Sequence, residues 1–118
     1  NVTVGNSGSS LLDVQNSGAE TVIIANYPWK NVFVSSSRKN FVDDLIQNDI
    51  EVIFLNFGSP FQILEYPMIK NHLGAFTSHR DVQEAAASIL AGEIPVQGLW
   101  PVNLPNSPNE TLDHWHIY

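Results

Sequence analysis

Short apolar runs alternate with segments of helical periodicity along most of this chain. Residues 21–25 (TVIIA) and 51–57 (EVIFLNF) are rich in β-branched and aromatic side chains and are apolar at successive positions. This pattern predicts strands that are covered on both faces. A third short strand is predicted over residues 73–76 (LGAF). The first run ends near Pro28 and the second at Gly58-Ser59-Pro60, where proline cannot continue a ladder.

Two segments show the 3.6-residue period of an amphipathic helix. The first follows Ser35-Ser36-Ser37, which supply N-cap candidates, and has apolar residues at Phe41, Val42, Leu45 and Ile46. The second is expected to be capped by Asp81 and to end at Gly92, a residue suited to the left-handed backbone after a helix. The stretch 61–70 between the strands is too interrupted by proline for a long helix.

The alternation of strands and helices predicts the α/β class. We expect a small, mostly parallel sheet flanked by helices, an α/β sandwich of flavodoxin-like type that is part of a larger domain. One domain over residues 1–118 is predicted, with a loop-rich leader (1–20), an α/β core (21–104) and a tail (105–118). Within the leader, residues 11–14 could form a short helical turn or an edge strand.

Composition narrows the classes of partner. The 118 residues carry 12 Asp and Glu against 5 Lys and Arg, for a formal net charge of −7, and no Lys or Arg follows Arg80. Because nucleic acids and anionic membranes need clustered cations, neither is expected as a partner. The chain has no cysteine, and its two N-x-[ST] sequons, at Asn1 and Asn109, matter only if the protein is secreted, so the compartment stays open.

Few residues offer chemistry. His114 and His116 lie two positions apart, so a strand would place both on one face, but no third ligand is evident and they remain weak metal candidates. His79 lies between a predicted strand and a helix, where α/β folds bind ligands. No dinucleotide, P-loop or nucleophile-elbow motif is present, and no metal or cofactor is expected.

Aromatic residues form the other group of candidates. Tyr27, Trp29 and Phe33 cluster after the first predicted strand, and Trp100 follows the last helix. Such side chains can stack on a sugar or contact another domain, and packing in the core is an equally good interpretation.

The segment from Ala19 to Leu104 resembles the C-terminal α/β domain of glycoside hydrolase family 3, which includes β-glucosidases and β-N-acetylglucosaminidases. The resemblance is carried by residues 52–60 (VIFLNFGSP), by 73–79 (LGAFTSH) with the alanine-rich helix that follows, and by 90–102 (LAGEIPVQGLWPV). Two positions depart from the family pattern. Leu99 stands where the family has a basic residue, and Trp100 stands where it has leucine.

The resemblance implies an accessory role rather than catalysis. In this family the nucleophilic Asp lies on an N-terminal TIM barrel. β-Glucosidases take their acid/base Glu from a loop of the C-terminal domain, and the corresponding loop here, residues 26–40, has no Asp or Glu. We therefore expect a non-catalytic domain that packs on a barrel of the same parent protein. The alternatives are a carbohydrate-binding module, with Tyr27 and Trp29 stacking on a sugar, and a stand-alone flavodoxin-like ligand-binding domain.

The family domain has further strands ahead of the position of Thr21. Without them, the strand predicted over 21–25 would leave an edge open. Two outcomes are expected with equal weight: a homodimer, or a fold completed by residues 2–4 as an extra strand.

Overall fold

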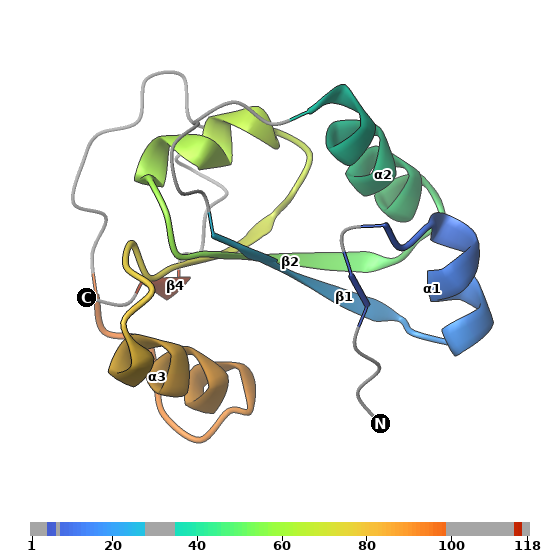
Figure 1. The fold of residues 1–118 in the computed structure, drawn as a ribbon. Coiled ribbons are helices and arrows are strands. Elements are labelled where there is room, and N and C mark those ends of the chain that lie inside the picture. The colour runs from blue at the N-terminus through green and yellow to red at the C-terminus, as the bar shows by residue number, and fades with distance from the viewer. Residues whose placement is uncertain (1–4, 7, 28–34, 99–114, 117–118) are drawn as a thin grey trace.

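The computed structural model describes residues 5, 6, 8–27, 35–98 and 115–116. They form an α/β structure, as predicted, in which helices lie on both faces of a small parallel sheet (Figure 1). In chain order the elements are α1 (Leu11–Ser17), β1 (Thr21–Asn26), α2 (Ser36–Gln47), β2 (Glu51–Asn56), the 3₁₀ helix η1 (Pro60–Glu65), β3 (Asn71–Gly74), α3 (Arg80–Leu90) and β4 (Trp115–His116).

The strands lie side by side in the order β1-β2-β3-β4, and every neighbouring pair is parallel. Thr21 is the register partner of Glu51, and Asn26 at the other end of β1 is the partner of Asn56. Gly74, the last residue of β3, is also a partner of Asn56. The carboxyl ends of β1, β2 and β3 therefore meet at one edge of the sheet.

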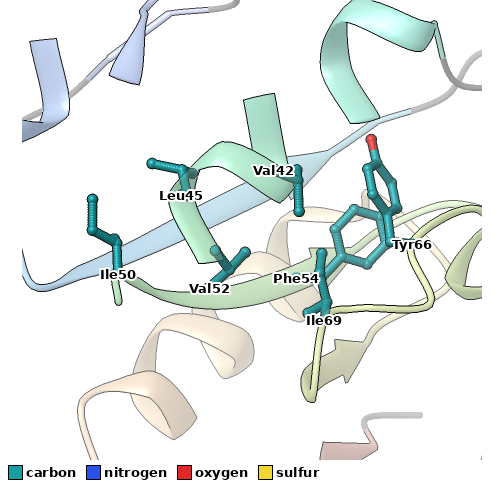
Figure 2. Packing of buried hydrophobic residues seen from close by; sticks show 7 residues of the cluster. All are labelled: Val42, Leu45, Ile50, Val52, Phe54, Tyr66 and Ile69. Atoms are coloured by element: carbon teal, nitrogen blue, oxygen red, sulfur yellow. The ribbon is translucent and has the colours of Figure 1, made fainter. Parts of the chain in front are cut away.

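Even-numbered residues of β1 and β2 face α1 and α2. Figure 2 shows the centre of this α2-side core, where Phe54 of β2 contacts Tyr66 below α2. Phe54 and Leu45 are fully buried. The cluster consists of Val42, Leu45, Ile50, Val52, Phe54, Tyr66 and Ile69, with Leu11 and Val14 of α1 packed against it. The apolar residues that recur with the helical period in α2 thus pack against the even-numbered residues of β2 in one apolar layer.

Odd-numbered residues of β2 and β3 face α3, which lies on the opposite side of the sheet (Figure 1). This α3-side core contains Leu55, Phe57, Leu73, Ala75 and Ala86. Val82, Ile89 and Leu90 of α3 are packed against it, so the apolar face predicted for this helix is confirmed.

The prediction that β1 is covered on both faces is wrong. Val22 and Ile24 pack against the α2-side core, but Ile23 is 50% exposed and Ala25 is exposed as well. The reason is topological: β1 is the outermost of the described strands, and the residues that pack against α3 come from β2 and β3.

The predicted bounds of the third strand and of α3 differ from those in the structure. The third strand covers Asn71–Gly74 instead of 73–76, because the chain turns at Phe76, whose φ is 57°. His79, not Asp81, occupies the N-cap of α3, without a capping hydrogen bond from its side chain, and Asp81 lies in the first turn. Near Gly92 the expectation is confirmed, since this residue has a φ of 75°.

The leader contains a capped helix, α1. Of the two alternatives for residues 11–14, the helical one is therefore confirmed and the edge strand is wrong. Ser10 and Asp13 form a capping box around the start of α1, and Gly18 ends the helix at a φ of 69°. Hydrogen bonds from the backbone and the hydroxyl of Ser10 lower the pKa of the Asp13 carboxyl.

The tail contributes β4, a two-residue strand that the sequence did not predict. Residues 2–4, the alternative extra strand, lie outside the described residues. No helix in the described part of the chain has the length and apolar character needed to cross a membrane.

Candidate functional site at the carboxyl edge of the sheet

Three buried side-chain amides gather where β1 and β2 end. Asn26 and Asn56 are the last residues of their strands and are register partners, and Gln62 belongs to η1. Their exposed fractions are 4%, 2% and 2%. Because burial of an unpaired amide is costly, such groups need hydrogen-bond partners within the protein.

The amides meet this need largely through one another. Asn26 Nδ2 donates to Asn56 Oδ1 at 3.3 Å and to Gln62 Oε1. Asn56 also holds the following turn, since its Oδ1 accepts from the Gly58 amide at 2.9 Å and its Nδ2 donates to the Ser59 carbonyl at 2.8 Å. We call Asn26, Asn56 and Gln62 the amide cluster. It ties two strand ends to η1.

Backbone bonds extend this connection to β3. The carbonyl of Asn56 accepts from the amides of Ala75 at 2.8 Å and Phe76 at 3.2 Å. At Gly74 an added Cβ would lie 2.4 Å from the ring of Phe76, so the absence of a side chain lets that ring fold back over the strand end. Three strand ends are thus fixed relative to one another.

An aromatic pair forms the outer rim of this edge. The rings of Tyr27 and Phe57 are stacked with centroids 4.5 Å apart and planes inclined by 13°. Phe57 is buried in the α3-side core, whereas Tyr27 is 46% exposed. Tyr27 therefore exposes part of a ring that is held in place by its neighbour.

His79 lies apart from the amide cluster, at the start of α3. Its Nδ1 is 3.7 Å from Asp81 Oδ2, and the two side chains are 72% and 84% exposed. Because both side chains are so exposed, solvent screens the interaction between them.

The remaining predicted site residues cannot be placed. Trp29, Phe33, Trp100 and His114 lie outside the described residues, and for His116 only the strand backbone is described. The described residues hold no group of three or more His, Asp or Glu side chains arranged to bind a metal ion. Of the predicted aromatic group, the structure places Tyr27 alone.

Sequence reasoning missed the amide cluster and a buried histidine. The signal for the amides was present, because Asn26 and Asn56 each end an apolar strand, but a polar residue in that position is also typical of an ordinary loop. His72 is 4% exposed within β3, with Nε2 2.7 Å from the carbonyl oxygen of Ile69 and its ring edge-on to Phe54.

Tyr66 is a buried phenol at the end of the α2-side core. Its hydroxyl has no hydrogen-bond partner among the described residues. Burial raises the pKa of Tyr66, with Glu65 acting in the same direction and Arg38 opposing it.

Tyr66→Phe is therefore expected to leave the free energy of unfolding at pH 7 unchanged or raise it by up to about 1 kcal/mol, because it removes an unsatisfied buried oxygen. The pH dependence follows from the raised pKa in the folded state. Stability should fall as pH rises through the pKa of an unfolded tyrosine, about 10. Urea titrations at pH 7, 9 and 10.5 should show a smaller alkaline loss in the variant than in the wild type. An equal loss in both proteins would contradict this assignment.

The described side chains where β1 and β2 end are of types suited to contact. The described residues at the ends of β1 and β2 are amides, aromatic rings and small residues, and no carboxylate lies among them. Buried amides bonded to one another fix geometry, and a half-exposed stacked ring offers an apolar surface.

Comparison of the chain with protein-family models, with characterised proteins and with solved structures finds no match.

Proposed function

We propose that this chain is a non-catalytic accessory domain of a glycoside hydrolase of family 3, and that it packs on a TIM barrel of the same parent protein. The proposal begins from the resemblance of residues 19–104 to the C-terminal α/β domain of that family. The parent would hydrolyse β-linked glucosides or N-acetyl-β-glucosaminides. Its nucleophile and its acid/base residue would lie outside this chain.

The observation that carries the proposal is the carboxyl edge of the sheet. Its polar groups are buried amides that bond to one another, so they are occupied in holding the strand ends. Among the described residues that end β1 and β2, Tyr27 places a half-exposed aromatic ring at this edge. A fixed edge with an apolar rim suits packing against another domain.

A carbohydrate-binding module is the second candidate, and the Tyr27–Phe57 stack favours it specifically. A ring that is held by a second ring loses little freedom when the face of a sugar packs on it. A stand-alone flavodoxin-like ligand-binding domain has no comparable support, since the edge shows no phosphate-binding loop among the described residues.

One set of measurements separates these functions. The purified chain should not hydrolyse aryl β-glucosides or aryl N-acetyl-β-glucosaminides, and the messenger RNA should encode, upstream of Asn1, a TIM barrel with a catalytic Asp. Turnover by the chain alone, or an upstream sequence without a barrel, would overturn the accessory role. Titration with N-acetylglucosamine oligomers, followed by tryptophan fluorescence, tests the second candidate. Saturable binding that Tyr27→Ser abolishes and Phe61→Ser leaves intact would favour it, because Phe61 is also exposed (43%) and belongs to η1.

A further inference from the structure

Among the described residues, no strand pairs with the outer edge of β1. In the described structure β1 pairs with β2 alone. The carbonyls of Glu20 and Asn26 accept from the amides of Glu51 and Phe57, so the even-numbered residues turn their backbone groups toward β2. Backbone groups alternate in direction along a strand, and those of Thr21, Ile23 and Ala25 therefore point outward.

This edge lacks the features that usually prevent pairing. Natural edge strands carry charged residues, proline or bulges. The strand TVIIAN has no charged residue and no proline, and its register with β2 is uninterrupted. Ile23 is 50% exposed and Tyr27 46%, both on the side of the sheet that α3 leaves uncovered at β1. The edge and the open face together fit a partner that contributes a strand.

We propose that the partner is β1 of a second copy, paired antiparallel about a two-fold axis at Ile23. Residues directly opposite in an antiparallel pair share a face, so in a symmetric pair odd residues must oppose odd residues. Pairing Ile23 with itself and Thr21 with Ala25 lets every outward-facing residue exchange both of its backbone hydrogen bonds. A shift of two residues in either direction leaves one of the three without an outward-facing partner within β1.

The positions of the acidic residues also favour antiparallel pairing of the two β1 strands. Glu20 and Glu51 lie at the amino end of β1. Antiparallel pairing sends the two sets of carboxylates to opposite ends of the shared ladder, and Glu20 then lies opposite the neutral Asn26. The result is a continuous sheet across both copies in which the two Ile23 side chains cover one another. This dimer does not depend on a barrel and goes beyond the accessory role.

The test uses the 118-residue chain, which has no cysteine, so any disulfide in a single-cysteine variant must join two copies. In the proposed register the Cα atoms of Ile23→Cys would be about 5.5 Å apart across the axis. This separation lies inside the range of about 4.4–6.8 Å for disulfides. The matched control is Ala25→Cys, also exposed and on the same face of β1, whose Cα atoms would be offset by about 13 Å along the strands.

Under mild oxidation we expect Ile23→Cys to form a covalent dimer at least tenfold faster than Ala25→Cys. Sedimentation of the wild-type chain should show a concentration-dependent monomer–dimer equilibrium. A wild-type chain that stays monomeric at high concentration overturns the proposal. So does equal cross-linking of the two variants. A monomer with slow amide exchange at Thr21, Ile23 and Ala25 also overturns it, and would assign the edge to residues 2–4 of the same chain.

Discussion

Replacement of Phe54 by alanine is expected to lower the free energy of unfolding by about 3–5 kcal/mol, the usual cost of truncating a buried phenylalanine. Phe54 is fully buried in the central strand region. Its ring lies 4.9 Å from that of Tyr66 and 5.8 Å from that of His72, centroid to centroid, so a cavity would open between β2, β3 and the segment after η1. Chemical denaturation monitored by circular dichroism measures the loss.

Since a small domain is stabilised by only about 5–15 kcal/mol, Phe54→Ala could leave too little folded protein to measure. Phe54→Leu retains most of the volume and is expected to cost about 1–1.5 kcal/mol. Phe61→Ala is the matched control, because Phe61 is 43% exposed, and it should change stability by less than about 1 kcal/mol. A loss at Phe61 equal to that at Phe54 would show that the α2-side core is not where the structure places it.

The sequence predicted β2 and α3, whose local residue patterns match their burial in the fold. β2 was recognisable because Val52, Phe54 and Leu55 fill both faces of a central strand, which removes polar alternation. α3 was recognisable because its apolar positions recur with the helical period and Gly92 follows them. In both segments propensity and tertiary burial agree.

Where burial depends on the position of a strand in the sheet, the sequence was misleading. Residues 21–25 have the same composition as a central strand, yet Ile23 and Ala25 are exposed because β1 lies at the edge of the described sheet. Strand order is set by long-range pairing, which a local pattern does not encode. For the same reason β4, a two-residue strand from the tail, was not predicted.

The candidate site could be located by sequence only in part. Tyr27 was selected for its ring, and the structure adds its stacking partner Phe57. The amide cluster was not selected, since its three members are 6 to 36 positions apart along the chain and meet only when parallel strands end in register. Polar residues at strand ends become informative once the register is known.

The exposed face of β1 connects the two proposals. Ile23, Ala25 and Tyr27 follow one another on that face, from the proposed dimer axis to the carboxyl edge of the sheet. A second copy paired at Ile23 would place Ala19 opposite Tyr27 and leave the stacked ring at the rim. The dimer edge and the contact surface at Tyr27 can therefore be perturbed separately, by Ile23→Cys and by Tyr27→Ser.

Asn56→Ala should be the most damaging change at the carboxyl edge, with an expected loss of about 2–4 kcal/mol in the free energy of unfolding. The substitution removes the acceptor of Asn26 Nδ2 and of the Gly58 amide, and the donor to the Ser59 carbonyl. Asn26 is 4% exposed, so water cannot readily replace its lost partner. Equilibrium urea unfolding measures the change.

Asn71→Ala supplies the comparison at the opposite end of the sheet. Asn71 also lies in a strand and donates through Nδ2, to Glu51 Oε1 at 2.9 Å, but both residues are accessible to water, which can take over the bond. Its loss should stay below about 1 kcal/mol. In a double-mutant cycle, Asn26→Ala combined with Asn56→Ala should cost less than the sum of the single changes, because each single change already removes the hydrogen bond between Asn26 Nδ2 and Asn56 Oδ1. A cost at Asn56 no larger than that at Asn71, or strict additivity with Asn26, would mean that the amide cluster does not hold the strand ends together.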